Sequence, residues 1–335
     1  MEANIEDCLW LCCGKPETCN RVCKNHRHKF VDQVREIGGF RLRDVPRAPA
    51  LSRPTLPPVV PLVYHGSSRK TPLANPVVAL RMADLVNFVT RKPRFEIREA
   101  LIESFGLSSD ARIILSGIDK DERIEPFWSL GDEMENIVRS FKEIGVEHVT
   151  TPNFSVVLDH PRYEDLHSIK KIGLMFAAFQ SAGMPCALHP NGRTEKDAER
   201  WSRFVAERFE VEALAYEFIT GPSRKDRKSF HVDHLTMIAE NCPRPLDIIL
   251  RGDPDVIPAL RKVFRTVTYI DTTGFMRSIK RQRAVRVGND HLEWTPTPTA
   301  KGAPIDELVE YNLRERELLL KSLYFADLKP LRKAA

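Results

Sequence analysis

The chain of 335 residues is long enough for one large domain or two ordinary ones, and 42% of its residues are hydrophobic, which suffices for a substantial core. Its formal net charge of +5 is modest for this length, so composition permits a nucleic-acid partner without requiring one. No apolar run approaches the roughly 18 residues of a membrane span, and the acidic, interrupted start does not resemble a secretion signal. We therefore expect a soluble, cytoplasmic protein without a membrane partner.

The cysteines are concentrated in one short segment, because five of the seven lie within the first 23 residues. Two pairs in this segment are spaced four residues apart, so their thiolates can converge on one zinc ion or one iron–sulfur cluster, and the spacing does not separate these two cofactors. The alternative is a set of reduced thiols on a short helical hairpin. The predicted metal ligands of this cysteine-rich head, residues 1–44, are Cys8, Cys12, Cys13, Cys19 and Cys23.

A proline-rich segment at 45–58 predicts an extended connector between the head and the main body. After it, short apolar runs alternate with amphipathic stretches. Two of these stretches, 166–183 and 198–209, carry apolar residues near helical spacing. The eight runs that we predict to be strands are 59–65, 77–80, 112–118, 148–154, 186–190, 213–219, 247–252 and 267–272.

This alternation of strands and helices along the chain predicts parallel strand pairing. Eight such units favour an α/β fold of the (β/α)8, TIM-like barrel type over residues 59–290, followed by a helical extension at 291–335. An open, doubly wound sheet is the competing architecture.

Function in such a barrel is expected where the strands end and the following loops begin. A ring of amide, imidazole, guanidinium and carboxylate groups there suits a polar, ring-shaped substrate such as a nucleobase or a sugar. The chain lacks a glycine loop for phosphates and a histidine pair on any predicted strand, so we expect no nucleotide cofactor and favour acid–base or covalent carboxylate chemistry. The predicted substrate-binding residues are His65, Asn153, Asp159, His189, Asn191, Arg193, Glu217 and Arg251.

The segment RPLDIILRGDPDVIPALRKVFRTVTYIDTTGFMRS, residues 244–278, resembles the last strand–helix–strand unit of the tRNA-guanine transglycosylase superfamily. The resemblance implies that Asp271 attacks or stabilises the anomeric carbon of a nucleotide. The segment ILSGIDKDE, residues 114–122, is a looser match that implies a second catalytic role for Asp119. The family carries a zinc site behind the last part of its barrel, and this sequence departs from it because no cysteine follows Cys242.

Bacterial relatives of this superfamily act on DNA, as deazaguanine-inserting transglycosylases or as glycosylases of phage defence. The resemblance therefore implies a DNA glycosylase or a base-exchanging enzyme, with DNA as partner and RNA as the alternative. Five cations that follow Asp271 are predicted to contact the nucleic-acid backbone, from a groove lining or a flexible strap; the alternative is a solvated surface. They are Arg277, Lys280, Arg281, Arg283 and Arg286.

Two other classes of function stay open at the level of sequence. One is a metal- or cluster-dependent barrel enzyme that acts on a small molecule. The other is a non-catalytic nucleic-acid-binding protein in which the head is a zinc knuckle.

Overall fold

The computed structural model of the protein describes residues 27–65, 68–157, 162–219, 221–300 and 302–327. The predicted head ligands Cys8, Cys12, Cys13, Cys19 and Cys23 and the predicted substrate-binding residue Asp159 lie outside these ranges.

Strands and helices alternate along the described chain, as predicted. The strands are β1 (Val59–Pro61), β2 (Val77–Arg81), β3 (Val86–Asn87), β4 (Lys92–Pro93), β5 (Arg112–Ser116), β6 (Val146–Thr150), β7 (Cys186–Ala187), β8 (Ala213–Phe218), β9 (Asp247–Gly252), β10 (Thr266–Asp271), β11 (Gln282–Val287) and β12 (His291–Pro296). The α-helices are α3 (Arg27–Glu36), α4 (Arg98–Phe105), α5 (Asp121–Trp128), α6 (Glu133–Glu143), α7 (Arg162–Ser181), α8 (Glu195–Glu207), α9 (Lys225–Glu240), α10 (Ile257–Leu260), α11 (Thr273–Ile279) and α12 (Asp306–Tyr324). Four short 3-10 turns complete the set, at Leu42–Asp44, Met82–Leu85, Gly221–Ser223 and Pro254–Val256.

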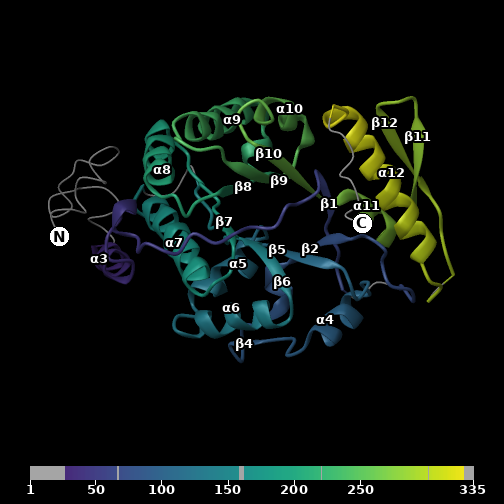
Figure 1. Ribbon diagram of the computed structural model, residues 1–335, viewed down its shortest axis with the longest axis horizontal. Helices are drawn as coiled ribbons and strands as arrows, with labels where there is room; N and C mark the ends of the chain where they lie inside the picture. Colours follow the sequence, from purple (N-terminus) through teal and green to yellow (C-terminus); the bar gives the residue numbers. More distant parts are fainter. Residues whose placement is uncertain (1–26, 66–67, 158–161, 220, 301, 328–335) are drawn as a thin grey trace.

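The eight predicted strands correspond to β1, β2 and β5 to β10, and they pair in parallel within two four-stranded sheets. One sheet has the order β1-β10-β9-β8 and the other β2-β5-β6-β7. Single parallel bridges, Leu62 with Ala79 and Leu188 with Leu214, connect β1 to β2 and β7 to β8. The result is a barrel-like mixed α/β fold, with helices arranged around the strands (Figure 1).

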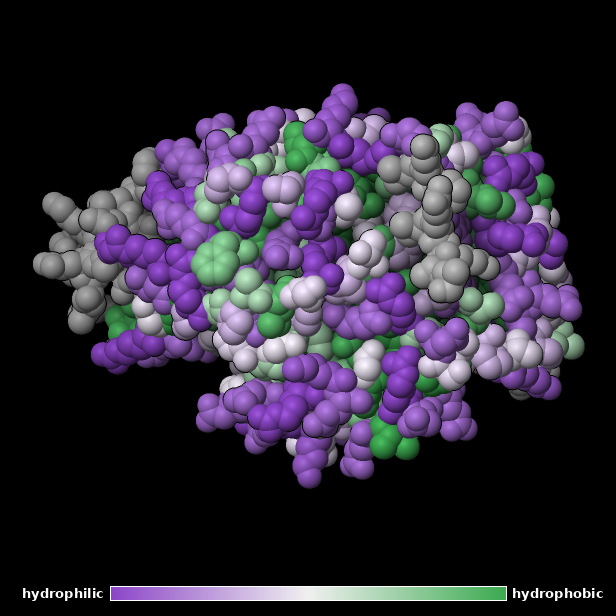
Figure 2. Space-filling view, in the orientation of Figure 1, coloured by the Kyte–Doolittle hydropathy of each residue, from purple (hydrophilic) through white to green (hydrophobic). Residues whose placement is uncertain are grey.

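Alternate residues of these strands form two different cores. A small cluster that includes Ala79, Ile114, Ala215, Ile249 and Ile270 lies among the strands themselves. The neighbouring positions on the same strands, such as Tyr216 and Tyr269, belong to the large core that also contains the helix residues. Both faces of each strand are therefore buried, as expected for parallel strands covered by helices. The outer surface in Figure 2 is mainly hydrophilic, with apolar side chains scattered between the charged ones.

The proline-rich connector runs across the amino-terminal ends of the strands. Arg53 is largely buried there and pairs with Asp247 at the start of β9. Arg265 and Thr266, at the start of β10, donate to the same carboxylate at 2.5 and 2.6 Å. Three donors therefore satisfy one buried carboxylate, and these polar contacts join the connector to the starts of β9 and β10.

The described part of the head packs on the main body. Ile37 and Phe40 form a buried cluster with Tyr163 and Leu166 of α7. Glu36 accepts hydrogen bonds from Trp128 Nε1 at 2.6 Å and pairs with His167 Nε2 at 2.7 Å. Residues 30–40 are therefore integrated with α5 and α7.

The C-terminal region contains both strand and helix. β11 and β12 form an antiparallel hairpin whose turn includes residue 290, the predicted end of the barrel segment. The helix α12 contacts the hairpin and also β1 and α11, so it fills the place of an outer helix beside β10 and β1 (Figure 1). None of the helices in the described residues is long and apolar enough to cross a membrane.

Candidate functional site

A cavity of about 330 Å³ lies over the carboxyl ends of β6, β7 and β8. It is formed by the loops that follow these strands and by the first half of α9. Its lining contains one carboxylate, two amides, three guanidinium groups and one imidazole. The lining residues are Asn153, Ser155, Val156, Val157, Asn191, Gly192, Arg193, Glu217, Gly221, Pro222, Arg224, Arg227 and His231. Four predicted substrate-binding residues, Asn153, Asn191, Arg193 and Glu217, are therefore brought together.

Strand alternation places Glu217 at the mouth of the barrel-like sheet. Ala213 and Ala215 of the same strand belong to the inner cluster, and side chains two residues apart share a face. Glu217 consequently follows them on the inner face, at the carboxyl end of β8. Its register partner on the adjacent strand β9 is Arg251.

The two amides are fixed by backbone contacts. Asn191 donates from Nδ2 to the carbonyl of Phe154 at 2.9 Å, and Asn153 Oδ1 accepts from the amide of Asp119 at 3.3 Å. The β5 end must approach β6 closely here, since a Cβ on Gly117 would lie 2.5 Å from the carbonyl oxygen of Thr150. Both amides are thus oriented before any ligand arrives, which lowers the entropic cost of binding.

A buried ionic network supports the loop that carries Arg193. Arg193 Nε lies 2.7 Å from Asp165 Oδ2, while Asp197 caps α8 and accepts from the amide of Arg193 at 3.0 Å. Arg162 is bound to Asp197 through both terminal nitrogens. Burial raises the pKa of Asp165 to about 6, in spite of the opposing charges of Arg193 and Arg162. The network ties the loops after β6 and β7 to α7 and α8.

The remaining guanidinium groups give the cavity a positive character. Arg227 donates to the carbonyl of Arg193 at 3.0 Å and stacks over Phe230 at 4.3 Å, and no carboxylate partner is found for it in the described part of the chain. Arg224 is exposed and approaches Asp226 at 3.3 Å. Two of the three lining arginines therefore remain available to an anionic ligand, since a solvated pair at this distance is weak.

His231 meets the tyrosine of β8 behind the cavity wall. Its Nδ1 lies 2.6 Å from the hydroxyl oxygen of Tyr216. His189, a predicted substrate-binding residue, stacks on the ring of Tyr216 with ring centroids 5.0 Å apart. His189 is fully buried and does not line the cavity, so the structure gives it a packing position rather than contact with a substrate.

Two further predicted residues lie at the mouth, Asp119 after β5 and Arg251 on β9 beside Glu217. Asp119 pairs with Arg123 at 3.1 Å, and Arg123 also binds the buried Asp84. Arg81, at the end of β2, contacts Asp84 at 2.8 Å. Arg251 donates across the mouth to the carbonyl of Ile118 at 2.5 Å. The side chain of Asp119 is thus held in a compact ion cluster with Arg123, while its backbone amide is bound to the cavity residue Asn153.

Asp271 faces away from this mouth. It follows Tyr269 on the outer face of β10, whereas Ile270 belongs to the inner cluster. Its Oδ1 accepts from Arg316 Nε of α12 at 3.0 Å and its Oδ2 accepts from the amide of Gly274 at 3.0 Å. With only 2% of its surface exposed, Asp271 joins β10 to α11 and α12, and this geometry does not favour the attacking role that the resemblance implies.

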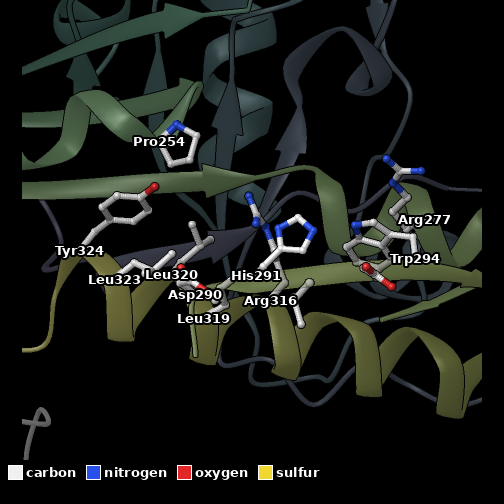
Figure 3. A pocket seen from close by; sticks show the side chains of 12 residues that line it. Pro254, Arg277, Asp290, His291, Trp294, Arg316, Leu319, Leu320, Leu323 and Tyr324 are labelled. Atoms are coloured by element: carbon white, nitrogen blue, oxygen red, sulfur yellow. The ribbon is translucent and has the colours of Figure 1, made fainter. Parts of the chain in front are cut away.

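A second cavity, of about 670 Å³, lies between the hairpin and α12. Figure 3 shows Tyr324 and Trp294 near its two ends, the leucines of α12 along one side, and Arg316 beside His291. Arg316 lines this cavity and Asp271 does not, so a ligand there would meet the guanidinium and not the carboxylate. The negative charges of Asp290 and Glu293 balance the positive charges of the arginines that line this cavity.

The predicted backbone-contacting cations lie on α11, on the two residues that follow it, and on β11 of the hairpin. Arg277 stacks over Trp294 at 5.4 Å, Arg283 over Tyr311 at 3.7 Å, and Arg281 donates to Thr299 at 2.7 Å. Arg286 is paired with Glu315 at 3.3 Å, while Lys280 is exposed. This hairpin lies at the opposite side of the molecule from α7 and α8 (Figure 1), so the basic segment and the cavity with Glu217 are separate.

Two further predictions concern His65 and the metal ligands. His65 is exposed and contacts Phe105 of α4 edge to face, with ring centroids 5.7 Å apart, so it stands outside the cavity. No group of three or more histidine, cysteine or acidic side chains suited to a metal ion occurs within the described ranges. The cysteine head itself lies outside those ranges.

Sequence reasoning missed several residues of the site. Arg81 stands directly after the predicted strand 77–80, so the rule that selected Glu217 was sufficient to find it. Arg227 and His231 lie on α9, a helix, where no strand-end signal marks them. Their contribution depends on a contact between α9 and β8 that is visible only in three dimensions.

No family model matches the chain, and no curated protein matches it. Among solved structures, the chain is similar to a protein of Burkholderia cenocepacia J2315 whose printed description is "a putative lyase/mutase". The identity is 15%, the match covers 74% of this chain and 88% of that chain, and the TM-score is 0.36. A TM-score this low does not inform function.

Proposed function

We propose that the two sheets form one (β/α)8 barrel and that the cavity with Glu217 is the active site of an enzyme that cleaves or exchanges an N-glycosidic bond in nucleic acid. One observation carries this proposal: a single carboxylate lies among two amides and three guanidinium groups, at the carboxyl ends of parallel strands. Enzymes built on such barrels use this end of the strands for catalysis.

The chemistry of the lining fits glycosidic cleavage. The transition state of this reaction resembles an oxocarbenium ion, which a nearby carboxylate stabilises. Amide groups such as those of Asn153 and Asn191 read the edge of a base by hydrogen bonds. The arginines of the lining would bind phosphate groups that flank the reacting nucleotide. A volume of about 330 Å³ is within the usual range for small-molecule sites and suits one extruded nucleoside.

Glu217 takes the role that the family resemblance gives to Asp271. Its side chain lies on the inner face and lines the cavity, whereas Asp271 is paired with Arg316 on the outer face. Asp119 is assigned a supporting role, because its backbone amide orients Asn153 and its carboxylate is engaged by Arg123. The proposed partner is DNA, and RNA substrates serve as a comparison in the test.

The hairpin gives independent support for a nucleic-acid partner. Arg277, Lys280, Arg281 and Arg283 have no carboxylate partner in the described part of the chain, and two of them rest on aromatic rings. Such cations favour binding to phosphates through release of counterions. The distance of the hairpin from the cavity suggests an extended substrate that contacts both.

The decisive experiment replaces Glu217 by glutamine and measures base release from normal DNA, modified phage DNA and RNA by mass spectrometry, with an alkali assay for abasic sites. The matched control is Glu212→Gln, since Glu212 lies at the amino end of the same strand region and outside the cavity. We expect Glu217→Gln to lower the rate by about 10²-fold or more and the control to leave it unchanged. Absence of base release from every substrate by the wild-type protein would overturn the proposed function.

A further inference from the structure

The hydrogen bond between Tyr216 and His231 joins β8 to α9 directly behind the cavity. The hydroxyl oxygen and Nδ1 are 2.6 Å apart, and Tyr216 is completely buried. Neither residue belongs to the set that the sequence singled out. The geometry of the pair determines on which ring nitrogen the histidine carries its proton.

The tyrosine is the donor in this hydrogen bond. If Nδ1–H donated to the tyrosine oxygen, the hydroxyl proton would need another acceptor, and none is found for it among the described residues. A buried hydroxyl proton without an acceptor is costly. The hydroxyl therefore donates to Nδ1, and a neutral imidazole then carries its proton on Nε2.

Both groups are neutral in the folded protein. Burial, followed by the charges of His234 and Arg227, lowers the pKa of His231 to about 3. Burial, followed by the charge of Glu217, raises the pKa of Tyr216 above its usual range. At neutral pH the pair consists of a phenol and an uncharged imidazole with one N–H.

That N–H is accessible from the cavity. His231 lines the cavity, and its Nε2 has no hydrogen-bond partner in the described part of the chain. The ring nitrogens of His189 and His234 are buried away from solvent and have no hydrogen-bond partner among the described residues. Nε2 of His231 does not belong to this group of buried atoms. Nε2–H of His231 is consequently a donor in the same cavity as Glu217.

We propose that His231 is a catalytic residue that donates a hydrogen bond from Nε2 to the leaving base, and that Tyr216 is the positioning residue that fixes this tautomer. This inference rests on the proposed glycosidic function. It also restricts the substrate, because the leaving base must present a carbonyl oxygen or an unprotonated ring nitrogen to Nε2–H. A neutral imidazole acts here by polarising the base and does not transfer its own proton.

The bond between the anomeric carbon and the base nitrogen breaks, and its electron pair moves onto the base, where Nε2–H of His231 stabilises the developing negative charge. Water adds to the anomeric carbon and gives one proton to Glu217. Glu217 or solvent then returns this proton to the released base, so the products are the free base and an anomeric hydroxyl group.

The tautomer can be tested without any substrate. Two-bond hydrogen–nitrogen correlation spectra of the ¹⁵N-histidine-labelled protein report which ring nitrogen is protonated, and we expect Nε2–H for His231 in the wild type. Tyr216→Phe removes the donor to Nδ1 and should shift the population toward Nδ1–H. Tyr269→Phe is the matched control, since it deletes another buried tyrosine hydroxyl, which donates to the carbonyl of Gly252 at 2.5 Å. An Nδ1–H tautomer in the wild type, or an unchanged spectrum in Tyr216→Phe, would overturn the positioning role.

The catalytic role is tested by base release from the substrate that the wild type cleaves. We expect His231→Gln to lower kcat by about 10²-fold with a small change in KM, and Tyr216→Phe to lower kcat roughly tenfold. Tyr269→Phe should retain wild-type kcat. Normal kcat in a folded His231→Gln variant, with Glu217→Gln inactive, would overturn this inference and leave the proposed function standing. A wild type without base release would instead overturn the proposed function, while the spectra still test the tautomer.

Discussion

Arg316 Nε donates to Asp271 Oδ1 at 3.0 Å, and this contact joins the last strand of the parallel sheet to the helix α12 across 45 residues of sequence. Both side chains are largely buried, with 16% and 3% of their surfaces exposed. Burial alone lowers the pKa of Arg316, but the charge and hydrogen bond of Asp271 more than compensate and raise it. The pair therefore behaves as a structural ion pair.

Replacement of Asp271 by asparagine should lower stability and leave chemistry intact. The change leaves the guanidinium of Arg316 buried without its counter-charge, and breaking a buried pair costs about 3 kcal/mol. We expect a lower melting temperature and a smaller free energy of unfolding in urea, with normal kcat for base release at a temperature where the variant is folded. Arg316→Gln should destabilise the protein by a similar amount.

The reverse result would restore the role that the family resemblance implies. A variant Asp271→Asn with a wild-type melting temperature and a base-release rate reduced by several orders of magnitude would identify Asp271 as the reacting carboxylate. Comparison with Glu217→Gln under the same conditions separates the two carboxylates.

The sequence was sufficient to predict the strands and the location of the cavity, but not the orientation of Asp271. Most of the eight strands are short and rich in Val, Ile, Leu and Ala, and the rule that polar groups follow such runs selected Glu217 and Asn153. In VTYID, however, both faces of the strand are apolar, so alternation alone does not reveal which face is inner. Arg316, which stabilises the outward orientation, is remote in sequence.

The basic segment illustrates the same limit. The sequence predicts a cluster of cations after Asp271 but not the hairpin that carries it, because the pairing of β11 with β12 depends on α12 beneath them. Asn312 of α12 accepts from the amide of Ala284 at 2.8 Å and donates to the carbonyl of Gln282 at 2.7 Å. These contacts come from a helix some 30 residues away.

Neutralising the hairpin cations should weaken nucleic-acid binding. The double variant Arg281→Gln/Arg283→Gln should flatten the dependence of log Kd on log salt by roughly 0.7 for each lost phosphate contact with single-stranded DNA, because fewer counterions are released. Fluorescence anisotropy over a series of salt concentrations measures the slope. Arg286→Gln is the control, since Glu315 already pairs with Arg286 at 3.3 Å. An unchanged slope in the double variant would favour the alternative interpretation, in which these cations form a solvated surface that does not contact nucleic acid.

The cysteine-rich head should contain a metal. We expect Cys19→Ser and Cys23→Ser to lose bound zinc or iron, measured by mass spectrometry of the purified protein, and to unfold at lower temperature, because metal binding contributes to the free energy of folding. Cys186→Ser is the control, since Cys186 is a buried free thiol of β7. Equal metal content in all three variants and the wild type would contradict the proposed site.

Acidification should destabilise the protein below about pH 6.5, because several histidines are buried in neutral form. Burial is the first cause that lowers the pKa of His148, His189 and His231 to about 3 and that of His234 to about 4. Between these values and the ordinary pKa of 6.5 the unfolded chain binds more protons than the folded one. The stability contributed by these groups is therefore present above pH 6.5 and is lost as the pH falls toward 3.

Asp165 acts in the opposite direction. Its pKa is raised to about 6 from 3.8, so the folded protein binds its proton more tightly, and its contribution is present below pH 3.8 and lost as the pH rises through 6. Because four imidazoles oppose one carboxyl group, the summed contribution of these five groups to the free energy of unfolding is still larger at higher pH. The free energy of unfolding should fall by about 1 kcal/mol per buried histidine between pH 7 and 5.5.

Urea unfolding at a series of pH values between 7 and 5 measures this loss. His148 is the best single position for a test, since it is fully buried within β6 and lies outside the proposed active site. In the variant His148→Gln, the free energy of unfolding should change less steeply with pH, by the contribution of one buried histidine. This holds whatever the effect of the substitution on stability at pH 7. A slope identical to that of the wild type, or a wild-type protein that becomes more stable on acidification, would show that these imidazoles do not titrate differently in the folded and unfolded states.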